Sequence, residues 1–179
     1  MLGPGGTSDL KAMPPPSATS VRSCTIRSVL ALAGWLAVAF TAAAVGGLFL
    51  PGDWYAGLQK PAWNPPNWIF GPVWTLLYTM MAIAAWLVWR RGGFVRHQKA
   101  LCLFLLQLCF NALWSPLFFG MHQPMLAFVD LVVLWLLLLG TVAAFWKTSR
   151  VAGTMLLPYL AWVTFAGALN WTLWKLNPF

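Results

Sequence analysis

Few side chains in this sequence could carry out acid–base or nucleophilic chemistry. The 179 residues include three acidic residues, none of them Glu, and two histidines. Two of the three aspartates lie outside the long apolar stretches, and His97 and His122 lie between such stretches. General acid–base catalysis needs such groups within reach of one substrate. The sequence therefore argues against a hydrolytic or acid–base enzyme, and we name no catalytic residue of that kind.

The cysteines do not indicate a metal site. Cys24, Cys102 and Cys109 are scattered, and no CxxC or Cys/His spacing occurs. Three cysteines are also too few for a disulfide framework. Cys102 and Cys109 are seven residues apart on one helix face, which is typical of small apolar packing residues.

The residues that could do chemistry are aromatic rings and amides at helical spacing. Spacings of three, four and seven residues place side chains on one face of a helix. Three segments each carry one such stripe: Trp74 and Tyr78; Gln107, Asn111, Trp114 and Phe118; and Tyr159, Trp162, Ala166 and Asn170. Amide groups exposed to lipid are costly, so these amides must face protein, water or ligand.

Two interpretations of the stripes remain open. The amides could join neighbouring helices by hydrogen bonds, as polar residues do within membranes. Alternatively, the three stripes converge on a pocket with flat π surfaces and a few hydrogen-bond donors, the usual composition of a small-molecule site. The presence of indole and phenol rings on all three favours the pocket.

Apolar helices must position these stripes. The chain is 60% hydrophobic and only 8% charged. The uncharged stretches exceed the roughly 20 residues that a helix needs to cross a bilayer. We predict an all-α membrane protein, a bundle of five transmembrane helices, with spans near 28–50, 70–90, 100–119, 125–146 and 151–174. Runs such as residues 131–139 are apolar on every face, which excludes a β-barrel.

Three residues inside the spans are unusual. Pro116 and Pro158 each remove a backbone hydrogen bond, which predicts kinks that open space in the third and fifth spans. Asp130 lies about five residues into the fourth span, near the interface. We favour a structural hydrogen-bonding role for Asp130 over a proton relay, because no second acid or buried base is available as its partner.

The formal net charge of +8 is better explained by the orientation of the chain in the membrane than by nucleic acid binding. The basic residues flank the spans and form no basic and aromatic patch. One side of the membrane would carry Lys11, Arg22, Arg27, Arg90, Arg91, Arg96, Lys99, Lys147 and Arg150, and the other side Lys60 and Lys175. The positive-inside rule then predicts a cytoplasmic N-terminus and a C-terminus on the outer side.

Three features lie before, within and directly after the first span. Residues 1–24 are rich in Gly, Pro and Ser, which predicts a disordered N-terminal tail before a single transmembrane domain of residues 25–179. In the first span, small residues recur every four positions, which allows close approach of another helix of the same chain or of a second subunit. The loop of residues 51–69 combines stiff prolines with tryptophans, which favours a lid over a cavity, although an interfacial aromatic belt would also use tryptophans.

These segments resemble the tryptophan-rich sensory protein or translocator protein family, TspO/MBR, also called peripheral-type benzodiazepine receptors. The resemblance rests on three stretches: WYAGLQKPAWNPPNWIFGPVWTLLY (54–78), QLCFNALWSPLFFG (107–120) and LPYLAWVTFAGALNW (157–171). It covers nearly everything from residue 28 onward. It implies a five-helix bundle, often dimeric, that binds porphyrins such as haem or protoporphyrin IX, and similar flat hydrophobic ligands, under the first loop.

The resemblance also assigns residues. It places Trp74, Asn111, Trp114 and Trp162 in the pocket, and Tyr55, Trp63, Asn64 and Pro65 in the lid. The sterol-recognition stretch of animal members departs from the pattern here, because Trp171 replaces its Tyr, which argues against sterol binding. The expected partners are thus the lipid bilayer, a porphyrin or haem that is not covalently bound, and a second subunit if the chain dimerises.

Three functions follow as expectations. The first is a receptor or sensor that binds porphyrins for tetrapyrrole transport or regulation. The second is an enzyme for light-dependent oxidative porphyrin degradation, which would use Trp74 and Trp162 and no acid–base residue. The third is a membrane scaffold without a ligand.

Overall fold

The computed structural model describes the backbone of residues 18–178 and the side chains of residues 25–178. The predicted tail lies outside this range for residues 1–17. Residues 18–24 were expected in the tail but are helical, because α1 begins at Ala18. A helix that leaves the bilayer needs no apolar face to keep its backbone hydrogen bonds, so composition alone marked its start too late.

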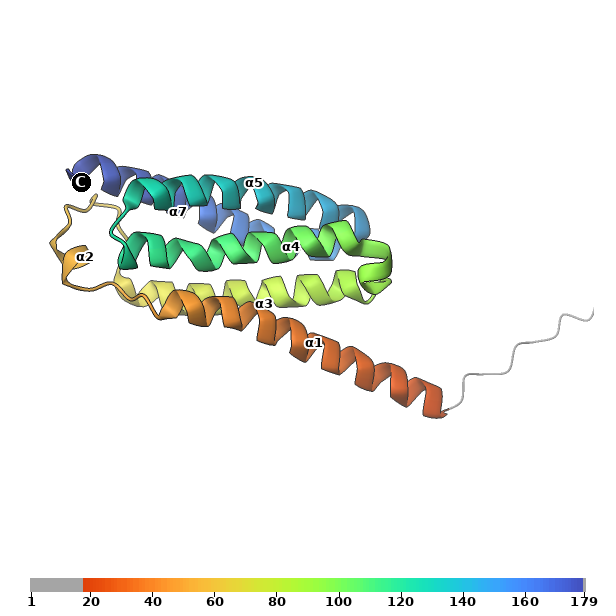
Figure 1. The fold of residues 1–179 in the computed structure, drawn as a ribbon. Helices are drawn as coiled ribbons and strands as arrows, with labels where there is room; N and C mark the ends of the chain where they lie inside the picture. The colour runs from red at the N-terminus through yellow and green to blue at the C-terminus, as the bar shows by residue number, and fades with distance from the viewer. Residues whose placement is uncertain (1–17, 179) are drawn as a thin grey trace, which may run out of the picture.

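Five long apolar helices make up the bundle (Figure 1). They are α1 (Ala18–Gly47), α3 (Phe70–Trp89), α4 (Gly93–Ser115) with its extension η2 (Pro116–Gly120), α5 (Pro124–Thr148), and α6 (Arg150–Met155) followed by α7 (Leu157–Leu176). The segment between α1 and α3 contains the short helix α2 (Asp53–Gly57) and the 3₁₀ turn η1 (Asn67–Ile69). The prediction of an all-α bundle with five spans is confirmed.

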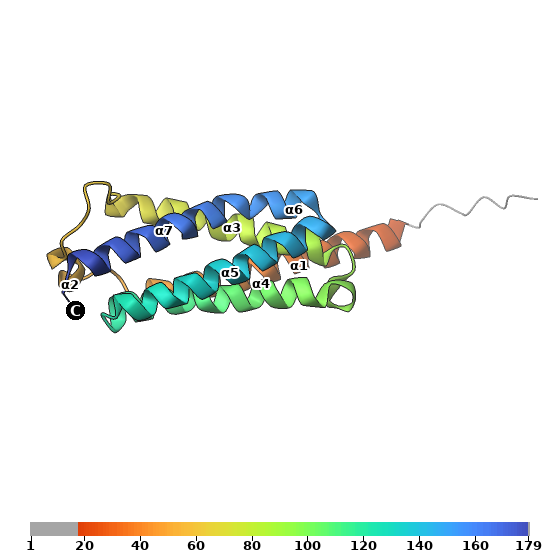
Figure 2. The ribbon, with the colours of Figure 1, turned by 90° about the horizontal axis from the view of Figure 1, so that it is seen from above.

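The helices run side by side along one axis, and the two ends of the bundle differ (Figures 1 and 2). One end holds α2, the turn between α4 and α5, and the C-terminus. The other end holds the turn between α3 and α4 and the break between α5 and α6. The N-terminal part of α1 extends beyond the other helices at this second end. We call residues 51–69 the lid segment and the end that it covers the lid end.

The half of the bundle away from the lid segment is packed solid. The face of α3 there consists of Met81, Ala82, Ala85 and other fully buried residues. Phe104 of α4 belongs to the same buried core and stacks on Phe145 of α5, with ring centroids 5.8 Å apart. Small side chains among large rings let helices pack closely.

Some of the small residues of the first span pack within the chain. Ala39 is fully buried, and a Cβ at Gly46 would lie 3.3 Å from the hydroxyl oxygen of Ser115 on α4. Gly46 therefore lets α1 approach α4 of the same chain, whereas Ala33, Ala37 and Gly47 are exposed, and contact with a second subunit stays a prediction.

Both prolines lie where the regular α-helix of their span is interrupted. Pro116 begins the π-helical turn η2, which continues α4 to Gly120. Pro158 lies in the first turn of α7, after a break at Leu156 that separates α6 from α7. Proline is tolerated in a first turn because the missing N–H has no partner there, so the helix restarts just before Pro158 within the fifth span.

Candidate functional site

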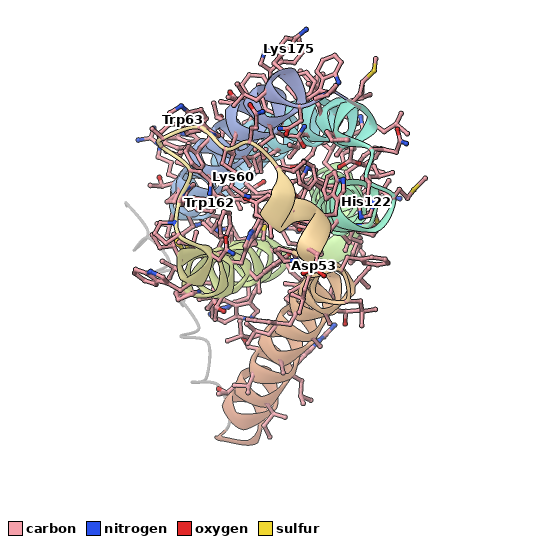
Figure 3. The ribbon with its side chains drawn as sticks, turned by 90° about the vertical axis from the view of Figure 1, so that its left-hand side faces the viewer. Asp53, Lys60, Trp63, His122, Trp162 and Lys175 are labelled. Atoms are coloured by element: carbon pink, nitrogen blue, oxygen red, sulfur yellow. The ribbon has the colours of Figure 1, made fainter. Side chains whose placement is uncertain are left out.

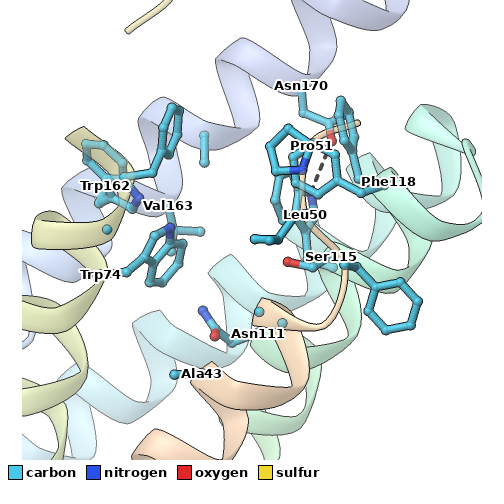
Figure 4. Close-up of a pocket in the computed structure, with 18 of the residues that line it drawn as sticks. Ala43, Leu50, Pro51, Trp74, Asn111, Ser115, Phe118, Trp162, Val163 and Asn170 are labelled. Atoms are coloured by element: carbon cyan, nitrogen blue, oxygen red, sulfur yellow. Dashed lines mark hydrogen bonds between the residues drawn. The ribbon is translucent and has the colours of Figure 1, made fainter. Parts of the chain in front are cut away.

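A cavity of about 760 Å³ occupies the half of the bundle under the lid segment. Its wall comes from α1, α3, α4 with η2, α5 and α7, with Pro51, Tyr55 and Asn67 of the lid segment. Figure 4 shows Trp74 and Trp162 together on one side of this space, and Leu50, Pro51 and Phe118 across it. The lining is mostly apolar, and no lysine, arginine, aspartate or glutamate of the described chain belongs to it.

Trp74 and Trp162 form one aromatic side of the cavity. Their rings are nearly perpendicular, with centroids 6.5 Å apart. Trp74 also contacts Tyr78 at 5.4 Å, and Phe70 meets Trp162 edge-on at 5.9 Å. Within the described part of the chain, neither indole N–H of this pair has a hydrogen-bond partner. The two indoles therefore offer π surface and two donors to the cavity.

A chain of hydrogen bonds joins α3, α4 and α7 beside the cavity. The Tyr78 hydroxyl donates to Asn111 Oδ1. Asn111 Nδ2 donates to the Tyr159 hydroxyl at 2.8 Å, which in turn donates to Gln107 Oε1 at 3.1 Å. Asn111 faces the cavity, whereas Gln107 and Tyr159 are fully buried behind the wall. The amides thus join helices, and Asn111 does so while also presenting a polar surface to a ligand.

A second amide links three helices at the opposite side of the cavity. Trp114 donates its indole N–H to Asn170 Oδ1 at 3.1 Å, and Asn170 Nδ2 donates to the Pro124 carbonyl at 2.8 Å. Trp114 also stacks on Phe118, with centroids 5.1 Å apart. These contacts fix the Trp114 ring as a rigid part of the wall.

The lid segment is fastened at several points above the cavity (Figure 3). Trp54 stacks on His122 of the turn between η2 and α5, with ring centroids 4.3 Å apart. The backbone of Gln59 forms two hydrogen bonds with the Asn177 side chain beyond α7, at 2.9 and 3.1 Å. Trp63 packs edge-on against Phe165 of α7 at 5.8 Å. The segment therefore covers the mouth of the bundle as a lid.

Tyr55 is the buried lid residue of the cavity wall, whereas Pro51 and Asn67 are exposed. It is buried, with 5% exposed, and packs on Phe118 and Phe119. Its hydroxyl donates to Asn64 Oδ1 at 3.3 Å, and Lys60 Nζ lies 4.6 Å from its ring centroid. Burial raises the pKa of the Tyr55 phenol above its usual value. The ring therefore stays neutral near physiological pH.

The structure separates the predicted site residues into two groups. The wall includes Tyr55, Trp74, Tyr78, Asn111, Trp114, Phe118, Trp162, Ala166 and Asn170. It does not include Trp63, Asn64, Pro65, Gln107 or Tyr159. Direct ligand contact stays a prediction for both groups, and the residues of the second group lie outside the wall. Helical spacing gives the direction of a side chain but not its depth, so residues behind the wall share a stripe with residues in it.

Sequence reasoning missed a further part of the wall. Phe40, Ala43, Gly46 and Gly47 of α1 line the cavity, as do Leu131 and Leu134 of α5. The four-residue spacing of small residues in α1 was a usable signal, because a helix face without bulk can border a space as well as a neighbour. The α5 leucines gave no signal, since that helix is apolar on every side.

Asp130 lacks the hydrogen bond that we expected for it. It is 5% exposed, and neither carboxyl oxygen has a hydrogen-bond partner among the described residues. The nearby amides are engaged with tyrosines, Trp114 and a backbone carbonyl, and residues 131–134 of its own helix are apolar. The expectation of a structural hydrogen bond is therefore wrong.

Comparison with known proteins confirms the resemblance. Residues 13–175 match the TspO/MBR family. Protein CrtK of Rhodobacter capsulatus is 43% identical over 140 residues, which cover 76% of this chain and 86% of CrtK. Tryptophan-rich protein TspO of Chlorobaculum tepidum is 40% identical over 159 residues, 85% of this chain and 99% of that protein. The human translocator protein is 43% identical over 138 residues, 74% of this chain and 82% of its own. The chain therefore belongs to the TspO/MBR family of multi-pass integral membrane proteins.

Proposed function

We propose that this protein is a membrane receptor that binds a porphyrin, such as haem or protoporphyrin IX, in the cavity under the lid segment. The observation that carries the proposal is the cavity itself, about 760 Å³ with Trp74, Trp114 and Trp162 in its wall. This volume lies within the range of roughly 300–1,000 Å³ that small-molecule sites occupy. Flat aromatic walls favour a flat conjugated ligand, because offset and edge-on ring contacts add to the burial of apolar surface.

The polar groups of the wall restrict how such a ligand binds. Asn111 and Asn170 already use both ends of their amides between helices, and the indole N–H groups of Trp74 and Trp162 remain available. No charged side chain of the described residues lines the cavity. A buried carboxylate without a partner is costly, so the macrocycle would lie inside and its carboxylates would stay at the water-facing mouth.

Porphyrin titration of the purified protein in lipid vesicles, followed by quenching of tryptophan fluorescence, tests the proposal. We expect saturable quenching with one site per chain. Linear, unsaturable quenching equal to that of vesicles that carry an unrelated tryptophan-rich membrane protein would overturn it and favour the scaffold. Product analysis in light and in the dark then distinguishes a receptor from an enzyme: unchanged porphyrin under both conditions supports the receptor.

A further inference from the structure

The exposed residues of the cavity wall lie on α1 and α3 and in the chain that joins them at the lid end, where Leu50, Pro51 and Asn67 are exposed. Ala44 and Gly47 near the end of α1 line the cavity and are exposed on the outside of the molecule. So are Gly71 and Thr75 in the first two turns of α3. By contrast, every lining residue described on α4, α5 and α7 is buried or half-buried. The space therefore opens between α1 and α3.

Close packing closes the side of α1 that faces α4 and η2. A Cβ at Gly46 would lie 3.3 Å from Ser115 Oγ, and a Cβ at Gly120 would lie 2.7 Å from the Phe49 ring. An added Cβ at Gly47 of α1 or at Gly71 of α3 would meet no atom within 4 Å. The end of α1 is thus held against α4 and η2, while these two glycines of the cavity wall border open space, which we call the gap.

The border of this gap suits hydrocarbon better than water. Both of its glycines belong to segments long and apolar enough to span a membrane. The hydroxyl of Thr75 donates to the Gly71 carbonyl at 2.9 Å, so it presents no unsatisfied donor to lipid. At the water-facing end, the lid segment is instead fastened by the stack of Trp54 on His122 and by the two hydrogen bonds of Asn177.

We infer that an apolar ligand enters the cavity from the bilayer, through a lateral opening between α1 and α3 that is bordered by Ala44, Gly47, Gly71 and Thr75. This inference rests on the proposed function for the nature of the ligand, but the opening itself can be tested without one. The lid segment, in this view, excludes water and stays closed while the ligand passes.

The first experiment measures access to the cavity with a chemical probe. The three native cysteines are replaced by alanine, and Ala166→Cys places a single thiol in the cavity wall. An uncharged, lipid-soluble maleimide in the vesicle membrane should label it. The double variant Gly47→Leu/Gly71→Leu, which fills open space, should slow labelling about tenfold, the effect of ~1.4 kcal/mol of added barrier. Gly34→Leu is the matched control on α1, because it also faces open space but does not line the cavity.

Equal labelling rates in the parent, the double variant and the control would overturn the lateral opening. Faster labelling by a charged, water-soluble thiosulfonate than by the lipid-soluble reagent would also overturn it and assign access to the lid end. Circular dichroism and thermal unfolding of each variant confirm that the bundle is intact.

The second experiment measures porphyrin binding kinetics in the same vesicles. Filling the gap obstructs passage in both directions, so the double variant should show slower association and slower dissociation than the parent, whereas the loss of a wall contact would speed dissociation. Asn177→Ala, which releases the lid segment from α7, should leave both rates near the parent values. Faster rates in Asn177→Ala together with unchanged rates in the double variant would contradict the inference. Absence of saturable binding in the parent would instead contradict the proposed function, and the thiol labelling would still decide the opening.

Discussion

The two halves of the bundle contain similar types of residue, but one half is a buried core and the other encloses the cavity. Away from the lid segment, fully buried alanines of α3 belong to one core with Phe104 and Phe145, whose rings stack. Under the lid segment, large rings on α3, α4 and α7 face one another, and the small residues lie on α1. Rings on three helices beside the small residues of α1 leave space between them. The comparison shows that aromatic content alone does not create a site, since the site depends on which helix carries the small residues.

The largest loss of stability should come from a substitution in the half of the bundle away from the lid segment. Phe104→Ala should lower the free energy of unfolding by about 3–5 kcal/mol, because Phe104 is fully buried and stacks on Phe145. Denaturant unfolding in detergent measures the loss. Phe40→Ala, at the cavity wall and 38% exposed, is the matched control and should cost less than about 1 kcal/mol. Equal losses would show that the two halves do not differ in packing.

The next largest effect should distinguish Asn111, an amide in the cavity wall, from Gln107, an amide buried behind the wall. Asn111→Leu removes the acceptor of the Tyr78 hydroxyl and the donor to Tyr159, and Gln107→Leu removes the acceptor of the Tyr159 hydroxyl. Each should cost about 1–3 kcal/mol of stability through unsatisfied buried groups. Porphyrin affinity should fall only for Asn111→Leu. A similar fall for Gln107→Leu would place that amide in contact with the ligand after all.

A smaller effect concerns the aromatic side of the cavity. Trp74→Phe or Trp162→Phe keeps an apolar ring but removes the free N–H and part of the π surface. Porphyrin affinity should drop about five- to tenfold, which corresponds to roughly 1 to 1.5 kcal/mol, with little change in stability. Fluorescence titration measures the drop. Trp146→Phe, 42% exposed and outside the cavity, should bind as the parent does. Parent-like binding by both cavity variants would make these tryptophans packing residues.

The smallest effect on porphyrin affinity at neutral pH should come from a substitution in the lid segment. Tyr55→Phe removes one hydrogen bond of 3.3 Å and should weaken porphyrin binding by about 0.5–1.5 kcal/mol. Burial raises the pKa of Tyr55, so its contribution is present below about pH 10 and is lost as pH rises above that value. Parent affinity should therefore be flat from about pH 6 to 9 and fall above 10. The Phe variant should show a weaker alkaline fall, and an unchanged profile would exclude Tyr55 as its source.

The sequence by itself determined the membrane class, the number of spans and which helix faces carry rings and amides. Hydropathy and 3.6-residue periodicity are local properties, and they reported Trp74, Asn111, Trp114 and Trp162 correctly as cavity-facing. The starts of α1 and α4 were placed late, because a helix can extend beyond its apolar part without any change in periodicity.

Only the tertiary structure decided how deep each side chain lies and which sides of the cavity are closed. Whether Tyr159 lies in the wall or behind it depends on how far α7 is rotated and displaced relative to α4, which no spacing within one helix encodes. The same holds for α1, whose small residues pack tightly on α4 at Gly46 and leave open space at Gly47, one residue later. A rotation of about 100° per residue in the helix turns neighbouring positions toward different surroundings, and only the placement of the other helices determines what those surroundings are.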